Sequence, residues 1–440
     1  MVNTIRSPLR LAHRPDGAYP QMTSQPDIDK LHDDYRRDYD PYSSVGIAEH
    51  LAEIADRREK MPISYSARGN GCWVLTRYDD ISSVLRRNNR GFISFPNDPD
   101  GINSQGSEEG MIPIEIDGIR HKQFRQLLDP MFSPKRVALL EDQLTQWANR
   151  LIDGFIGKGA CDFVEEFALP FPGVTVLTIM GWPTEDMHKM NAWTATLLHG
   201  VVGGTPEETM AARGQAHVEM REYMLNMITE RRGVPRTDDV TSAALDVEID
   251  GKKLTDLELF DLFLLMMTAG LDTVQSVLSQ SMVYLARHPE QWDRMFENPD
   301  ALAPAIEELL RWAAPAVPTR TIVDESADVG ELTLPKGERV HFPLAAANRD
   351  PKYYPDPDKI KFDREPKPHL AFGMGPHRCV GLHLARLELK IAFTELRRRM
   401  PEFRLADDCR PHEHLGLAWG VEDVRLEFEP AQSETTAAIG

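Results

Sequence analysis

A glycine-rich loop around one cysteine contains the residue types that can prepare a sulfur atom for metal binding. Cys379 lies in FGMGPHRCVG, residues 372–381, whose three glycines and proline predict a tight turn with mostly backbone around the sulfur. Backbone N–H groups and the N-terminus of the helix expected just after the loop both favour a thiolate over a thiol. A thiolate held in this way is a good axial ligand for haem iron. The remaining cysteines are interpreted as ordinary buried thiols: Cys72, Cys161 and Cys409.

A second group of candidate residues forms the sequence AGLDT, residues 269–273, inside a long apolar stretch. Ala269 and Gly270 are small enough to let another body approach a helix backbone closely, at some cost in helix stability. The Thr273 hydroxyl can bond back to the carbonyl of Ala269 and bend the helix locally. Asp272 is an acid among apolar neighbours. Taken alone, such an Asp-Thr pair is more typical of a helix cap or a surface.

Two further motifs place charged residues on single helix faces. His121 and Arg125 are one helical turn apart in HKQFR and can reach the same anion. Glu308 and Arg311 have i, i+3 spacing, so their side chains meet on one face. Each pair by itself is more typical of a solvated surface, and the case for function depends on their joint occurrence.

The elements that must position these residues are mostly helices. Thr255 and Glu258 form a capping box that starts a helix, and the step from His288 to Pro289 ends it, so roughly 32 residues span about 48 Å. A helix this long and apolar must run through the middle of the molecule. Other helices are predicted over residues 136–156, 206–232, 289–296, 302–313 and 382–399. Strands are predicted at ISYSA and CWVLT, which form a hairpin across residues 68–71, and near Arg320, Val340 and Val424.

The composition limits the class of protein. The chain has 440 residues, 41% hydrophobic and 27% charged, without an internal repeat or a low-complexity linker. We expect one large domain over residues 31–430, with flexible segments at 1–30 and 431–440. The net charge of −19 makes a nucleic-acid partner improbable. No apolar run is long enough for a signal peptide or membrane span, and the isolated cysteines suit a reducing compartment, so a cytoplasmic, soluble protein is expected.

The cysteine loop resembles the haem-binding loop of the cytochrome P-450 family, FGxGxHxCxG, and the other motifs follow in the order typical of that family. The likeness runs from about residue 36 to 430 and is greatest to soluble bacterial members of the camphor hydroxylase type. The resemblance implies a mainly α fold with a smaller β-rich lobe. Haem b is then expected between the long central helix and the cysteine loop, with Cys379 as the ligand of its iron.

The resemblance also implies roles for other residues. Glu308, Arg311 and Arg364 are expected to form a buried structural network behind the cysteine loop. Asp272 and Thr273 would be the acid–alcohol pair beside the oxygen site. The expected haem-binding residues, which include the donors to its propionates, are His121, Arg125, Ala269, Gly270, Arg320, Phe372, His377 and Gly381. The expected substrate pocket draws on Leu265, Thr268, Ala269, Val317 in the 316–318 turn, Leu417 and the variable stretch 91–120.

The implied activity is hydroxylation of a small apolar molecule, with a terpenoid suggested, using O₂ and two electrons from NAD(P)H. Because no second cofactor motif is found, we expect a ferredoxin and its reductase to deliver the electrons. Ferredoxins are typically acidic, so Lys122, Arg125 and Arg378 are the candidate docking residues, although solvated surface charge explains them equally well. Two alternatives stay open: a peroxide-using haem–thiolate enzyme, which would usually lack the acid–alcohol pair, and a non-catalytic haem sensor.

Overall fold

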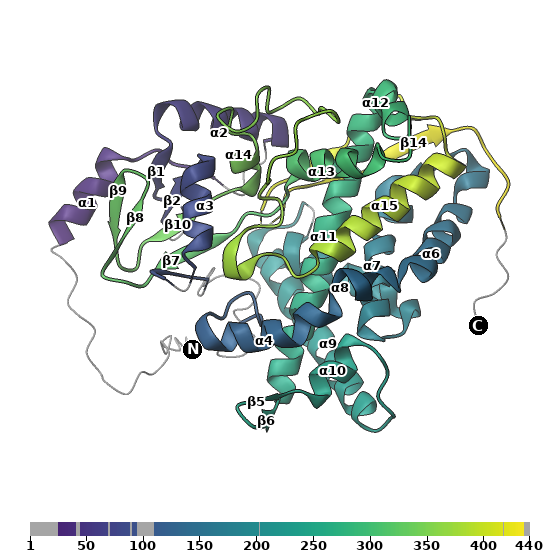
Figure 1. The fold of residues 1–440 in the computed structure, drawn as a ribbon, viewed down its shortest axis with the longest axis horizontal. Helices are drawn as coiled ribbons and strands as arrows, with labels where there is room; N and C mark the ends of the chain where they lie inside the picture. Colours follow the sequence, from purple (N-terminus) through teal and green to yellow (C-terminus); the bar gives the residue numbers. More distant parts are fainter. Residues whose placement is uncertain are drawn as a thin grey trace.

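Helix α11 (Asp256–Arg287) is the central element of the molecule, and most of its residues are buried. The computed structural model describes residues 25–40, 45–68, 71–88, 90–94, 110–201, 203–416 and 418–434. Thr255 caps α11 in the predicted capping box, since its side chain accepts from the Glu258 N–H and the Glu258 side chain accepts from the Thr255 N–H. The helix runs down the middle of Figure 1, with α6 and α15 on its right and the strands β1, β2, β7 and β10 on its left.

The helical part surrounds α11 on several sides. Helices α7, α8, α9 and α13 pack directly against it. The helices besides α11 are α1 (Gln25–Asp34), α2 (Ile47–Lys60), α3 (Tyr78–Arg86), α4 (Gly118–Met131), α5 (Pro134–Ala138), α6 (Glu141–Asp153), α7 (Pro170–Met180), α8 (Met187–His199), α9 (Pro206–Arg232), α10 (Val240–Asp246), α12 (Pro289–Arg294), α13 (Leu302–Ala313), α14 (Leu344–Asn348) and α15 (Leu382–Arg399).

The β-rich lobe is built on a five-stranded sheet with the order β1-β2-β10-β7-β3. Its strands are β1 (Ile63–Ser66), β2 (Cys72–Leu75), β10 (Arg339–His341), β7 (Thr319–Ile322) and β3 (Phe92–Ile93). Strands β1 and β2 form the predicted antiparallel hairpin, whereas β10 joins β2 in parallel. Among the described residues, a three-stranded sheet consists of β11 (Phe403–Leu405), β14 (Arg425–Phe428) and β4 (Ala160–Asp162). The other strands form pairs: β12 (His412–His414) with β13 (Gly420–Glu422), β5 (Glu248–Ile249) with β6 (Lys252–Lys253), and β8 (Ser326–Val329) with β9 (Leu332–Pro335).

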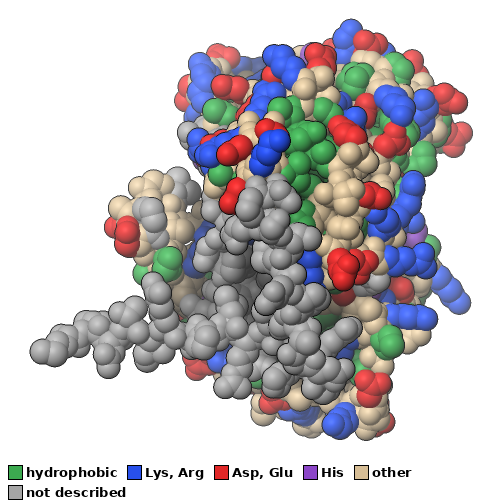
Figure 2. All heavy atoms as spheres, turned by 90° about the vertical axis from the view of Figure 1, so that its left-hand side faces the viewer, with side chains coloured by type: hydrophobic (Ala, Val, Ile, Leu, Met, Phe, Trp, Pro, Cys, Tyr) green, Lys and Arg blue, Asp and Glu red, His purple; other side chains and the backbone are tan. Residues whose placement is uncertain are grey.

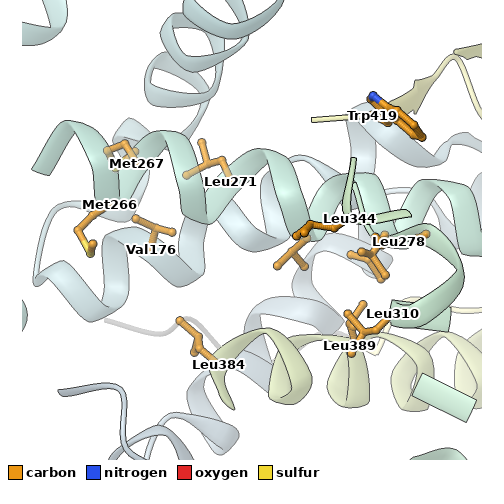
Figure 3. Packing of buried hydrophobic residues seen from close by; sticks show 14 of the residues in the cluster. Val176, Met266, Met267, Leu271, Leu278, Leu310, Leu344, Leu384, Leu389 and Trp419 are labelled. Carbon is orange, nitrogen blue, oxygen red and sulfur yellow. The ribbon is translucent and has the colours of Figure 1, made fainter. Parts of the chain in front are cut away.

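The apolar core lies between α11 and the helices around it. Leu278 of α11, Leu310 of α13 and Leu389 of α15 converge in Figure 3, and all three side chains are buried. Burying a leucine side chain stabilises the fold by about 1.5–3 kcal/mol. These contacts fix α15, and therefore the loop just before it, relative to the centre of α11.

The fold agrees with the predicted mainly α architecture with a smaller β lobe, but two helix boundaries were wrong. The single helix predicted over 136–156 is two helices, α5 and α6, because the N–H groups of Leu139 and Leu140 bond three residues back, to Arg136 and Val137, and turn the chain. The helix predicted over 289–296 ends at Arg294. Helix α1 begins at Gln25, inside the segment 1–30 that was expected to be flexible.

The face with the strand-rich lobe carries both signs of charge. Lys and Arg side chains alternate with Asp and Glu over the part of that face visible in Figure 2. The net charge of −19 is therefore not gathered there as one acidic block. Within the described ranges, no helix is long and apolar enough to cross a membrane.

Candidate haem–thiolate site

The cysteine loop folds back on itself through short backbone bonds. The Cys379 N–H donates to the Phe372 carbonyl at 2.9 Å, and the Gly373 N–H donates to the Leu370 carbonyl at 2.8 Å. Gly375 has a positive φ of 74°, and a Cβ at this position would lie 2.3 Å from the Leu85 carbonyl oxygen of α3. Only glycine meets both requirements, so the predicted tight turn depends on this residue. Phe372 lies against the guanidinium of Arg386, 4.7 Å from its ring centre.

The Cys379 sulfur lies deep in the protein and yet has an exposed surface, as expected for the wall of an internal space. Burial raises the pKa of its thiol. The Gly381 N–H and the charges of Arg125, Arg386 and Arg378 act in the opposite direction. The predicted backbone donor is therefore present and acts in the predicted direction, although burial has the larger effect on the pKa of the thiol. A cation bound at the sulfur would offset the cost of burying the thiolate.

One face of α11 is open to the interior space although the helix around it is buried. Ala269 is exposed, and Gly270 and Thr273 are partly exposed, while Leu271 and Asp272 between them are buried. The Thr273 hydroxyl donates to the Ala269 carbonyl at 2.9 Å, which confirms the predicted local bond. Gly270 is needed for helix packing. A Cβ at position 270 would lie 2.5 Å from the side chain of Val176, so glycine allows α7 to pack closely against α11 (Figure 3 labels Val176).

The Asp272 side chain is bonded to a residue of another helix. Its Oδ1 lies 2.8 Å from Nε2 of His199, the last residue of α8. The His199 ring contacts the ring of His414 on β12, with centroids 4.3 Å apart. The acid of the predicted acid–alcohol pair is therefore part of a polar cluster of three side chains from three elements.

The predicted propionate donors gather beside the cysteine loop. The rings of His121 on α4 and His377 stack with centroids 4.0 Å apart, and His377 Nε2 lies 2.8 Å from Asp117 Oδ1. Buried Arg320 on β7 donates through Nη1 to the Thr319 carbonyl at 2.7 Å. Its Nε is buried and has no hydrogen-bond partner among the described residues.

The electrostatics of this group favour an anion. Burial lowers the pKa of Arg320 to about 10, with Asp117 opposing the shift. Burial also lowers the pKa of His121 to about 3, and the charges of His377 and Arg125 add to that shift. A buried donor without a partner is costly, and a carboxylate satisfies it with a charge-assisted bond. The arrangement therefore fits the propionates of a haem whose iron lies at Cys379.

Arg125, predicted as a propionate donor and docking residue, bonds to the protein itself. It donates through Nη1 to the Arg378 carbonyl at 2.6 Å and through Nε to Asp129 at 2.7 Å, which ties α4 to the cysteine loop. The side chains of Lys122 and Arg378 are exposed. Of the three candidate docking residues, these two have side chains that a partner protein can reach most readily.

The predicted network behind the loop is confirmed. Glu308 accepts from Arg311 Nε at 2.7 Å and from Arg364 Nε at 3.0 Å, and both Glu308 and Arg311 are buried. Arg311 also donates to the Asn348 carbonyl at 2.8 Å, and the Asn348 side chain accepts from the Leu370 N–H at 2.7 Å. The network thus reaches the first residues of the cysteine loop.

The predicted substrate-pocket residues are only partly described. Leu265, Thr268 and Val317 are buried, and Ala269 faces the interior space. The Thr268 hydroxyl donates to the Leu264 carbonyl of its own helix at 2.9 Å. The segment at Ala316 pairs with Ala418. Leu417 and residues 95–109 of the variable stretch lie outside the described residues.

Sequence reasoning did not identify three of the polar residues in this region. His199 bonds to Asp272, His414 contacts the His199 ring, and Asp117 accepts from His377. Each is separated by many residues from the group it contacts, so no spacing rule connects them. The only local signal was an acid, Asp117, just before the helix that carries His121.

Comparison with known proteins gives consistent results. The family model described as cytochrome P-450 matches residues 184–408. The chain is 33% identical over 369 residues to a methyl-branched lipid omega-hydroxylase of Mycobacterium tuberculosis, covering 79% of this chain and 84% of that protein. It is 30% identical over 393 residues to the biotin biosynthesis cytochrome P-450 of Bacillus subtilis, and the match covers 89% of this chain and 91% of that protein. The structure is similar to the solved structure of P450BioI in complex with an acyl carrier protein ligated to hexadec-9Z-enoic acid. The TM-score is 0.76 and the identity 28%, and the match covers 86% of this chain and 98% of that chain.

Proposed function

Since this chain belongs to the cytochrome P-450 family and is a haem b monooxygenase, we propose that it hydroxylates an apolar, branched hydrocarbon of the terpenoid or lipid type. We propose further that a ferredoxin and its reductase deliver the two electrons from NAD(P)H. The relatives named above include an enzyme that acts on a methyl-branched lipid, which supports an apolar substrate with branched carbons.

The apolar wall beside Ala269 is the observation that carries the substrate proposal. Leu265 lies one turn before Ala269 on α11 and is buried, and the Thr268 hydroxyl is already bonded to its own helix at 2.9 Å. The wall therefore presents hydrocarbon surface and few unsatisfied polar groups. Each Å² of apolar substrate surface that is removed from water in such a site contributes about 25 cal/mol to the free energy of binding.

The chain's own residues have distinct tasks around the haem. Cys379 would bind the iron as a thiolate, and Arg320, His121 and His377 would bind the propionates. Bound haem supplies the capacity to bind O₂ and to cleave its O–O bond with two electrons. Gly375 and the Arg311 network help to hold the chain around the cysteine loop in place.

Thr273 and Asp272 would manage protons in a space whose walls are mostly apolar. The Thr273 hydroxyl is oriented by its bond to the Ala269 carbonyl, so its oxygen is fixed on the open face of α11. Asp272 lies one residue before it and is bonded to His199. An enzyme that accepts peroxide directly, or a haem sensor, has no need of this arrangement, which is why the O₂-dependent reaction is preferred here.

The test is spectroscopic and then catalytic. Reduced protein under carbon monoxide should show the red-shifted Soret band of thiolate ligation, and Cys379→Ala should lose it because no other side chain supplies the sulfur. Cys72→Ala is the matched control and should keep the band. Retention of the band in Cys379→Ala would overturn the ligand assignment. Apolar branched compounds that shift the Soret band of the oxidised protein should then be hydroxylated with NADH and a ferredoxin system.

A further inference from the structure

A buried polar cluster lies where the end of α8, the middle of α11 and β12 meet. His199 closes α8, Asp272 belongs to α11, and His414 belongs to β12. His199 Nε2 and Asp272 Oδ1 are 2.8 Å apart, and the two imidazole rings are in edge contact at 4.3 Å. The established activity gives no role to either histidine.

The two oxygens of Asp272 have different surroundings. Oδ1 bonds to His199, whereas Oδ2 is buried without a hydrogen-bond partner in the described part of the chain. Asp272 as a whole residue is 7% exposed. A buried carboxylate oxygen is costly to leave unpaired, and an ordered water is the usual partner in such a place. Asp272 therefore has one oxygen bonded to a histidine and a second, buried oxygen that is available to a water.

His199 lies between Asp272 and the solvent. Its side chain is 19% exposed, compared with 9% for Asp272. As the last residue of α8, it also lies at the end of the helix dipole that favours a cation. The imidazole is thus the more solvent-accessible end of the His199–Asp272 pair.

The charged groups around His199 decide which imidazole carries a proton. Burial alone lowers the pKa of His199, but the bond and charge of Asp272 and the charge of Glu422 on β13 outweigh burial and raise it, against the charge of Arg213 on α9. Burial and the neighbouring His199 lower the pKa of His414 to about 4, with His412 adding to the shift and Asp272 opposing it. A proton is therefore held more tightly by His199 than by His414, whose ring packs against it.

We propose that His199 is the residue through which protons reach Asp272, as the outer half of a relay from solvent to the open face of α11. This proposal rests on the proposed monooxygenase function and assigns a positioning and proton-transfer role that is specific to this chain. The geometry carries it: one hydrogen bond joins a partly exposed imidazole to an enclosed carboxyl group whose second oxygen has no partner in the described part of the chain.

The proton balance of the relay is simple. The N–H bond at Nε2 of the imidazolium breaks as an O–H bond forms at Oδ1, leaving a neutral imidazole and a carboxylic acid. Rotation of the carboxyl group about its Cβ–Cγ bond turns this O–H toward the interior, where it donates to a water. The carboxylate that remains returns to His199, which takes a new proton from solvent. No electron moves in these steps.

The first test needs no turnover. In isotope-labelled, haem-loaded protein, the resonance of His199 is identified by its loss in His199→Gln, and its titration is followed by NMR. The His199 pKa should lie above the ordinary value of about 6.5 and should fall in Asp272→Asn, because the carboxylate charge is removed. A titration that is the same in both proteins would overturn the coupling on which the relay depends.

The second test separates proton transfer from simple support of Asp272. Gln at position 199 can still donate a hydrogen bond to Oδ1 but carries no titrating proton. In the parent, the rate of substrate-dependent O₂ consumption should fall as pH rises through the raised His199 pKa, since the imidazolium is lost. His199→Gln should be slower on the order of 10²-fold at neutral pH and should lose that pH dependence. His217→Gln, a buried histidine on α9, is the control and should keep the parent profile.

Each outcome has a definite meaning. A faster His199→Gln would show that His199 restrains Asp272, and an unchanged rate and profile would show that it only fills space; both overturn the relay. If parent protein with the thiolate Soret band produced no hydroxylated product from any substrate, the proposed function would fail, while the NMR titration would still decide whether His199 and Asp272 are coupled.

Discussion

At the scale of single residues, the Thr273 hydroxyl is the polar group fixed on the open face of α11 by its bond to Ala269. Thr273→Ala should bind substrate and accept electrons normally, because neither step uses that hydroxyl. The variant should consume NADH and O₂ at a comparable rate but release more peroxide and less product. Thr273→Ser, which keeps the hydroxyl, is the control. Product formed per NADH measures the difference, and equal coupling in Thr273→Ala would refute the role.

Asp272 should behave differently from Thr273 because it supplies protons rather than holding the oxygen site. Asp272→Asn keeps the size of the side chain but removes the carboxylate that bonds to His199 at 2.8 Å. Oxygen consumption itself should slow, while the fraction of NADH that ends in product changes less. If Asp272→Asn and Thr273→Ala gave the same pattern of fast, uncoupled turnover, the separation of their roles would be wrong.

At the scale of elements, the Glu308 network joins α13 to the cysteine loop through Arg311 and Asn348. Glu308→Ala leaves the buried Arg311 guanidinium without its carboxylate, which costs roughly 3–5 kcal/mol. Little folded, haem-loaded protein should result. Asp293→Ala on α12 is the control, since Asp293 is 71% exposed and its single ion pair with Arg397 contributes only about 0–1 kcal/mol. Haem content and the unfolding midpoint should separate the variants, and equal stability would contradict the structural role.

At the scale of the whole molecule, the net charge of −19 opposes an acidic electron donor unless the docking face is locally basic. Lys122→Glu and Arg378→Glu should raise the ferredoxin concentration needed for half-maximal reduction and weaken its dependence on salt. The exposed Lys60 of α2, on another part of the molecule, should tolerate the same charge reversal. An equal effect of Lys60→Glu would mean that total charge, not a docking face, controls association.

The sequence alone determined the features whose partners lie within one helical turn. The capping box at Thr255, the Thr273 bond to Ala269 and the Glu308–Arg311 pair are local, because i, i+3 and i, i+4 spacing brings the groups together in any helix. The cysteine loop was identifiable for a similar reason, since its glycines and its cysteine are all within ten residues. The family resemblance and the activity class follow from these local patterns.

Only the tertiary structure decided which distant residues meet. His199 and Asp272 are 73 positions apart, and His121 stacks on His377 from a different element, so no periodicity joins them. The close contact between Gly270 and Val176 exists because α7 packs against α11 at that point. The raised pKa of Cys379 is also a tertiary property, because burial by the whole fold outweighs the backbone donor that the loop supplies. Packing sets burial, which raises the pKa of Cys379 and lowers that of His121, whereas at His199 the bond and charge of Asp272 outweigh burial.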